Sequence, residues 1–150
     1  MASLRFIYSG MDTVTSATSN RTEGMSPAAT RAFAVFEQGV RHSYGDDLLK
    51  LVLFGSRARG DAHKESDLDI AVILKSISNR STDRKRLADI AYEAIVETYL
   101  DVQALPVSLD EWEHPEHHSN PALIRVIKRD GNVIEAGHDP RVTEQGFSVR

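Results

Sequence analysis

The chain has no cysteine among its 150 residues. Disulfides, zinc sites built on thiolates and cysteine nucleophiles are therefore excluded. Long apolar runs are also missing, because stretches such as LLKLVLF are far too short to cross a bilayer. The N-terminus carries no sustained apolar region of the kind found in signal peptides. These absences predict a cytoplasmic protein that does not associate with membranes.

An excess of positive charge is also absent. Eighteen Lys and Arg residues face 22 Asp and Glu residues, which gives a net charge of −4. A general nucleic-acid binder needs a basic surface to neutralise phosphates, so this class is disfavoured. A local basic patch could still hold one small polyanion. The composition, 41% hydrophobic and 27% charged, is that of an ordinary globular protein, and the length suits one domain.

The domain is expected to occupy residues 26–136. Residues 1–25 are predicted to form a flexible N-terminal extension, because segment 12–24 is small, polar and rich in Thr and Ser. Residues 137–150 are predicted to form a C-terminal tail. One packed unit with two appendages is therefore the expected organisation.

The pattern of apolar residues predicts an alternation of helices and strands. The expected elements are a helix from Ser26-Pro27, strands at 49–54 and 68–74, a helix capped by Ser81 or Thr82, a strand at 99–107, a polar loop or short helical turn at 110–119, a helix from Asn120-Pro121, and a short strand at 132–135. The order helix, strand, strand, helix, strand, helix predicts an α/β or α+β fold with helices packed on one side of a small sheet.

Asp67 and Asp69 are the first candidates for chemistry. Residues two apart on a strand share a face, so both carboxylates would point one way while Leu68 and Ile70 enter the core. Two such carboxylates can bracket a pair of Mg²⁺ or Mn²⁺ ions, and magnesium completes its shell with substrate phosphates. The alternative is an ordinary strand entrance with both aspartates in solvent.

A Gly-Ser turn precedes this pair by ten residues. Gly55 allows a tight turn and a close approach of the backbone to a ligand. Free N–H groups after it, together with the Ser56 hydroxyl, suit a phosphate. Arg57, Arg59 and Lys64 add positive charge nearby. Taken alone, the turn also fits a plain loop with solvated charges.

The two motifs together favour a phosphate and metal site. A Gly-Ser pair, ten residues and Asp-x-Asp should occur by chance in on the order of one chain in a few hundred of this size. One half would bind a triphosphate and the other the metals that the triphosphate needs. Such sites usually have another carboxylate near the attacking hydroxyl, which holds one metal and helps to remove the proton. Asp101, early in the third predicted strand, is the candidate, although a solvated strand residue is its alternative.

The stretch LFGSRARGDAHKESDLDIAVIL resembles the signature of the minimal nucleotidyltransferases of the DNA polymerase β-like superfamily. The resemblance implies that fold over residues 28–135 and transfer of a nucleoside monophosphate from an NTP, usually ATP, with release of pyrophosphate. By the same resemblance, Gly55 and Ser56 would hold the β- and γ-phosphates. Asp67 and Asp69 would ligate both Mg²⁺ ions, and Asp101 one of them. Arg57 and Arg59 would contact phosphate or shape the loop.

The resemblance also implies partners. Standalone chains of this size in the family often act as antitoxins beside a helical HEPN ribonuclease toxin, and some adenylylate a tyrosine on it. One alternative is a binding module that neutralises its toxin without catalysis. Another is a small-molecule enzyme of the aminoglycoside-modifying kind. Such enzymes generally form the acceptor site with an added helical domain, and in this case a second copy of the chain in a homodimer would supply that part of the site.

Two further clusters have ordinary structural interpretations. The run EHPEHH, with His114, His117 and His118, invites a zinc site, but a polar loop containing proline is a poor ligand platform. Arg80 and Arg84–Arg86 form a basic cluster at a predicted helix start, where cations are disfavoured. A solvated face is the expected interpretation of the basic cluster, and a nearby phosphate or acidic partner is the alternative.

Overall fold

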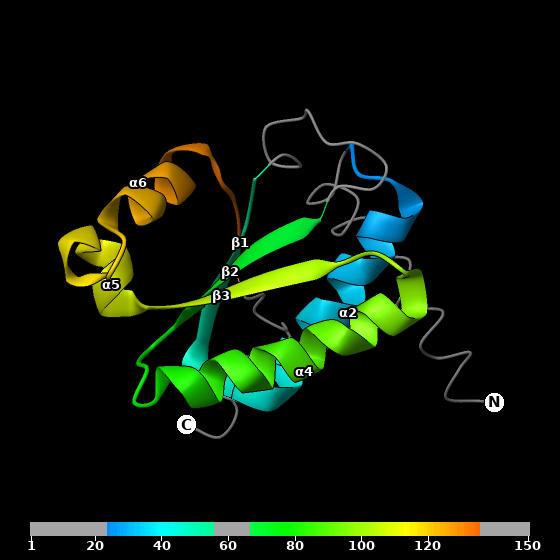
Figure 1. The fold of residues 1–150 in the computed structure, drawn as a ribbon, viewed down its shortest axis with the longest axis horizontal. Coiled ribbons are helices and arrows are strands. Elements are labelled where there is room, and N and C mark those ends of the chain that lie inside the picture. The colour runs from blue at the N-terminus through cyan, green and yellow to red at the C-terminus, as the bar shows by residue number, and fades with distance from the viewer. Residues whose placement is uncertain (1–23, 56–66, 136–150) are drawn as a thin grey trace, which may run out of the picture.

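The computed structural model describes residues 24–55 and 67–135 (Figure 1). The elements are α2 (Pro27–Tyr44), β1 (Leu48–Phe54), β2 (Leu68–Leu74), α4 (Arg80–Thr98), β3 (Val102–Ser108), α5 (Leu109–Glu113), α6 (Pro121–Asp130) and β4 (Asn132–Glu135), with 3-10 turns at Gly45–Asp47 and Pro115–His117. The predicted N-terminal extension, apart from its last two residues, and the predicted tail lie outside the described residues. The α/β fold class is confirmed, and the order of the elements is the predicted one.

Side-chain caps fix where the helices begin. The Ser26 hydroxyl accepts a hydrogen bond from the Ala29 N–H at 3.1 Å, and α2 starts at the next residue, as predicted. Asn120 caps α6 in the same way through the Leu123 N–H. The predicted cap of α4, Ser81 or Thr82, is wrong. The Asn79 side chain accepts from the Thr82 N–H at 3.0 Å, which places Ser81 and Thr82 inside the first turn.

The third strand starts later than its predicted start at residue 99. Helix α4 continues to Thr98, and Tyr99 ends it with a left-handed backbone at φ 59°. Its N–H donates to the Ile95 carbonyl at 2.7 Å, so Tyr99 belongs to the helix cap and not to the sheet. Strand β3 then begins at Val102, directly after Asp101.

The four strands form one mixed sheet in the order β3-β2-β1-β4. Strand β1 is antiparallel to both β2 and β4, whereas β2 and β3 are parallel and joined through α4. Pro106 lies in β3, an edge strand, where its missing N–H leaves no ladder bond unmade. Because β1 runs antiparallel to β2 and β3, its C-terminal end lies at the same end of the sheet as their N-terminal ends.

Helices cover both faces of the sheet, so the prediction of helices on one side is wrong (Figure 1). Helices α2 and α4 pack on one face, against residues that include Ile70 and Val72. The other face carries a second core, in which Ala71 and Ile73 pack with Trp112 of α5 and with α6. Strand β2 is apolar on both faces, and such a strand must be covered on both. Within the described ranges, no helix is both long and apolar enough to span a bilayer.

Candidate active site

The predicted acidic residues lie at the same end of the sheet, at the beginnings of two neighbouring strands. Asp67 directly precedes β2, and Asp69 is the second residue of that strand, opposite Phe54 at the end of β1. Asp101 directly precedes β3, and its carbonyl accepts a hydrogen bond from the Leu68 N–H at 2.9 Å. This bond continues the parallel ladder one residue beyond the strands. The beginnings of β2 and β3 are thereby held side by side.

The carboxylates lie on one face of these strands. Leu68 and Ile70 are fully buried in the core beneath α2 and α4, which confirms the predicted alternation. Asp67 and Asp69 have the opposite parity and therefore point to the other face. Strand β3 follows the same rule, since Val102 packs in the first core and leaves Asp101 on the opposite face. Asp67 and Asp101 are exposed, and Asp69 is half-buried.

Gly55 lies at the same end of the sheet, directly after the last residue of β1. Its φ of +77° is a conformation that residues with a side chain rarely adopt. A Cβ atom built on it would stand 3.2 Å from Asp69 Cγ, and closer still to Asp69 Oδ2. The Asp69 carboxylate therefore lies directly against the Gly55 backbone. The sequence suggested Gly55 as part of a phosphate-binding turn. In the structure its missing side chain also leaves space for the Asp69 carboxylate.

Gln103 is a neighbour of the site that the sequence interpretation missed. Its side-chain amide donates to Asp101 Oδ2 at 2.7 Å, and its backbone lies opposite Asp69 in the parallel register. The amide thus fixes the orientation of the Asp101 carboxylate at the strand entrance. The signal was present in the sequence, because a residue two positions after Asp101 shares its face.

The three candidate aspartates carry the type of oxygen ligand that divalent metal ions prefer. Carboxylate oxygens are the ligands that Mg²⁺ and Mn²⁺ prefer, and Asp67, Asp69 and Asp101 supply them from adjacent strand entrances. Among the residues that the structure describes, no three acidic or histidine side chains already form a metal-binding group. Ser56, Arg57 and Arg59, the predicted phosphate contacts, lie outside the described residues.

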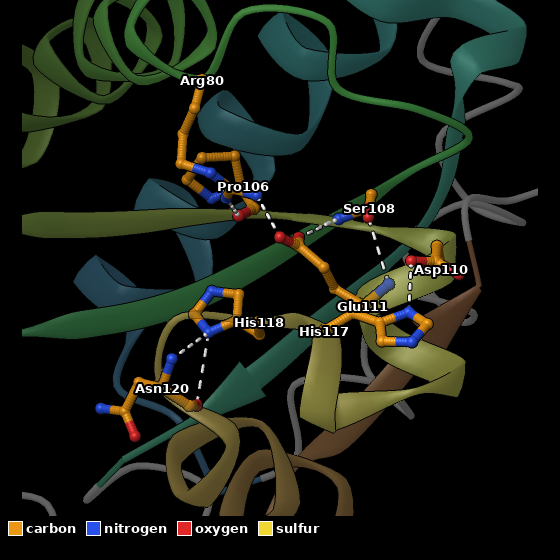
Figure 2. Close-up of polar contacts among 8 residues, drawn as sticks. All are labelled: Arg80, Pro106, Ser108, Asp110, Glu111, His117, His118 and Asn120. Carbon is orange, nitrogen blue, oxygen red and sulfur yellow. Dashed lines mark hydrogen bonds and ion pairs between the residues drawn. The ribbon is translucent and has the colours of Figure 1, made fainter.

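A second polar cluster lies at the opposite end of β3 (Figure 2). Arg80, the first residue of α4, donates to the Pro106 carbonyl at 2.8 Å and pairs with Glu111 of α5. The Glu111 carboxylate also accepts from the Ser108 N–H at 2.9 Å, which completes a capping box. Burial raises the pKa of Glu111, but its bonds to Arg80 and Ser108 outweigh burial and hold the pKa below the ordinary value.

These contacts give the basic cluster internal partners. Besides the pair of Arg80 with Glu111, Lys85 pairs with Asp89 at 3.3 Å, and the Arg86 guanidinium lies over the Tyr44 ring at 5.1 Å. The acidic partner expected as an alternative for the cluster is therefore found, for Arg80, within the same chain. The cluster ties α4 to β3, α5 and α2.

The histidines of the run EHPEHH make different contacts, although the rings of His114 and His117 lie 5.2 Å apart. His117 is exposed and forms a 2.8 Å bond with Asp110, which raises the pKa of that imidazole above its ordinary value. His118 is buried, and its Nδ1 accepts from the Asn120 N–H at 2.9 Å. His117 and His118 thus hold the connection between α5 and α6 (Figure 2).

Replacing Arg80 by Ala is expected to destabilise the fold by about 1–2 kcal/mol near neutral pH, since the half-buried Glu111 carboxylate loses its charged partner and keeps only the bond from the Ser108 N–H. The pKa of Glu111 is depressed in the folded state, so this contribution is present above the unfolded pKa of about 4.3 and is lost as pH falls through the folded value. Urea denaturation of the wild type and of Arg80→Ala, at pH values above and below about 4.3, measures both the loss of stability and its dependence on pH. Lys85→Ala, which breaks an exposed pair, should change stability by no more than about 0.5 kcal/mol.

A hollow of about 200 Å³ lies near the start of α4, lined by residues that include Tyr44, Asp47, Asn79 and Asp83. Tyr44 donates to Asp83 there at 2.8 Å. Asp67, Asp69 and Asp101 do not line this hollow. The acidic candidates instead occupy the other end of the sheet, at the strand entrances beside Gly55.

Comparison with known proteins agrees with the sequence motif. The family described as "Nucleotidyltransferase domain" matches residues 35–131, which is more than half of the chain. A protein of Methanocaldococcus jannaschii named "Putative protein adenylyltransferase MJ1305" is 41% identical over 93 residues, which are 61% of this chain. The match spans 62% of the length of that relative.

Two solved structures are similar at a lower level. One is described as a "putative nucleotidyltransferase" from Sulfolobus solfataricus, with 21% identity, a TM-score of 0.46, and coverage of 74% of this chain and 89% of that one. The other is described as a "toxin-antitoxin with AMP-PNP", with 20% identity, a TM-score of 0.46, and coverage of 73% and 78%. The family match over residues 35–131 includes the Gly-Ser turn, both motif aspartates and Asp101. The chain belongs to the nucleotidyltransferase domain family.

Proposed function

We propose that the protein transfers a nucleoside monophosphate, AMP from ATP, to a hydroxyl group of an acceptor protein and releases pyrophosphate. The observation that supports the proposal is the parallel register that puts Asp67, Asp69 and Asp101 at the beginnings of two adjacent strands, with Asp69 against Gly55. In the reaction the acceptor oxygen bonds to the α-phosphorus. The bond from that phosphorus to the oxygen bridging to the β-phosphate breaks, and pyrophosphate leaves with the electron pair.

Each residue has a distinct role in this proposal. Asp67 and Asp69 would hold two Mg²⁺ ions, and Asp101, oriented by Gln103, would hold one of them on the acceptor side. The bound metals would neutralise phosphate charge and polarise the phosphoryl oxygens. Gly55 and Ser56 would bind the β- and γ-phosphates through backbone N–H groups and the hydroxyl. Asp101 would also accept the proton of the attacking hydroxyl.

The acceptor is proposed to be a protein because the 41% identical relative carries the name of a protein adenylyltransferase. A HEPN-type toxin encoded beside the chain is the specific acceptor that the sequence resemblance implies. In that case the protein would serve as an antitoxin whose catalysis inactivates its partner.

A labelling assay tests the proposal. Purified protein is incubated with Mg²⁺, ATP labelled at the α-phosphate, and either a cell lysate or an isolated HEPN-type partner. Label should appear on a protein band and fall by at least about 10²-fold in the Asp67→Asn/Asp69→Asn double variant, because a bound metal supplies several kcal/mol to the transition state.

Asp89→Asn is the matched control for the aspartate variants. Asp89 is an exposed carboxylate on α4 that forms a 3.3 Å pair with Lys85, far along the chain from the motif aspartates, so labelling should be unchanged. ATP binding without transfer to any protein would reject protein modification and favour a binding module or a small-molecule acceptor. Failure to bind Mg-ATP at all would reject the nucleotidyltransferase assignment of this site.

A further inference from the structure

Gln103 lies in a regular arrangement with the three candidate aspartates. The parallel register pairs Asp69 with Gln103, and the same register, continued to the residues that precede the two strands, places Asp101 beside Asp67. All four side chains have the parity opposite to that of the strand residues buried beneath α2 and α4. One face of the sheet therefore carries two carboxylates from β2, with one carboxylate and one amide beside them from β3.

The side chain of Gln103 bonds to one oxygen of Asp101. Its Nε2 donates to Asp101 Oδ2 at 2.7 Å. A carboxylate has lone pairs on both oxygens, so this bond leaves Oδ1 to another partner. An amide is neutral, and it orients the carboxylate without cancelling its charge as a lysine or arginine would. The contact thus keeps Asp101 a full anionic ligand.

A contribution to the stability of the fold does not account for this bond. Asp101 and Gln103 are both exposed, and neither belongs to the two cores of the described segments. Water can replace either partner of an exposed hydrogen bond, so the net stabilisation is small. What the bond does is restrict the rotamers of an exposed aspartate. It therefore acts on the orientation of the carboxylate.

We propose that Gln103 is a positioning residue that holds Asp101 in the orientation in which it binds the acceptor-side metal ion, and that its neutral amide makes this binding depend on ATP; the inference rests on the proposed function. The first part follows from the bond to Oδ2, which leaves Oδ1 to the ion. The second follows from charge, because three carboxylates hold divalent ions less firmly than four would. The phosphates of ATP supply the missing oxygen ligands and negative charge.

Titration with Mn²⁺, in which electron paramagnetic resonance counts the free ions, tests the inference without measuring transfer. The ions are added with α,β-methylene-ATP, an analogue that cannot release pyrophosphate. The wild type should then bind two ions. Gln103→Ala should keep one ion at wild-type affinity and bind the other at least about tenfold more weakly, since loss of an outer-shell partner typically lowers metal affinity by about 10–100-fold.

Gln103→Glu tests the role of the neutral amide. The substitution keeps the length of the side chain, removes the donor and adds a fourth carboxylate. Without nucleotide the wild type should bind Mn²⁺ weakly, and Gln103→Glu should bind it at least about tenfold more tightly. Gln38→Ala is the matched control, because it removes an exposed glutamine from α2, on the other face of the sheet, and should leave every affinity unchanged.

Three results would contradict the inference. Equal affinities of Gln103→Ala and the wild type for both ions would overturn the positioning role. Equal affinities of Gln103→Glu and the wild type without nucleotide would overturn the dependence on ATP. A melting temperature of Gln103→Ala well below that of Gln38→Ala would assign the bond to the fold and overturn the inference as well.

Failure of the proposed function gives a different pattern. If the wild type binds no Mn²⁺ with the analogue, or if Asp67→Asn/Asp69→Asn binds it as firmly as the wild type, the proposed metal site fails and the inference fails with it. Two ions in the wild type, with unchanged binding in Gln103→Ala, would overturn the inference alone. Transfer of label from ATP to a partner protein would then still support the proposed function.

Discussion

Gly55→Ala is expected to reduce Mg-ATP binding and nucleotidyl transfer at least tenfold and to destabilise the fold by about 1–2 kcal/mol. The loss of stability follows from the backbone, since alanine at a φ of +77° is strained. The loss of function follows from the new methyl group, which would overlap the Asp69 carboxylate. The Asp69 carboxylate would then have to rotate away from its position against the Gly55 backbone at the end of β1.

Gly45→Ala separates these two effects. Gly45 also has a positive φ, at +53°, but a Cβ atom added to it would meet nothing within 4 Å. The control should therefore lose a similar amount of stability and keep nucleotide binding. Urea denaturation and calorimetric titration with Mg-ATP provide the two measurements. Equal nucleotide affinity in Gly55→Ala and Gly45→Ala would show that the Asp69 position beside Gly55 does not matter for binding.

Local signals in the sequence were sufficient for much of the fold. Ser26-Pro27 and Asn120-Pro121 combine a capping side chain with a proline in the first turn, and both helices start there. Strand β2 has the predicted bounds, because its seven residues are apolar apart from Asp69 and follow a polar stretch of sequence. Signals of this kind act within a few residues and need no tertiary contact.

The errors arose where the outcome depended on competing local partners or on distant contacts. Asn79, Ser81 and Thr82 can all cap a helix, and only the observed bond to the Thr82 N–H selects Asn79. Tyr99 has the propensity of a strand residue, yet the cap of α4 overrides it. The covering of the second sheet face depends on Trp112 and α6, which are distant in sequence from β2.

The sequence was sufficient to predict that two of the candidate site residues share a face, but not how the other candidates lie relative to them. The Asp-x-Asp alternation follows from strand geometry, so the sequence alone placed Asp67 and Asp69 on one face. The position of Asp101 depends on the parallel register of β2 with β3, which the connection through α4 sets. The contact between Asp69 and Gly55 depends on the antiparallel register of β1 with β2. Neither register was evident from the sequence pattern.

Leu68→Ala is expected to destabilise the fold by about 2–5 kcal/mol, because the side chain is fully buried beneath α2 and α4. Leu68 lies between the two motif aspartates but points to the opposite face, so its side chain has no place in the proposed chemistry. Its backbone N–H, which binds the Asp101 carbonyl, is retained in the variant. Below its melting temperature the folded variant should therefore bind Mg-ATP with the affinity of the wild type.

Asp69→Asn should show the opposite result, with stability close to that of the wild type and Mg-ATP affinity reduced at least tenfold. Val133→Ala, at a 47% exposed position of β4, should change stability by no more than about 0.5 kcal/mol and leave affinity unchanged. Thermal denaturation followed by circular dichroism, and titration with Mg-ATP at low temperature, distinguish the three variants. If folded Leu68→Ala binds as weakly as Asp69→Asn, then core packing beneath β2 sets the carboxylate positions, and the two faces of the strand are not independent.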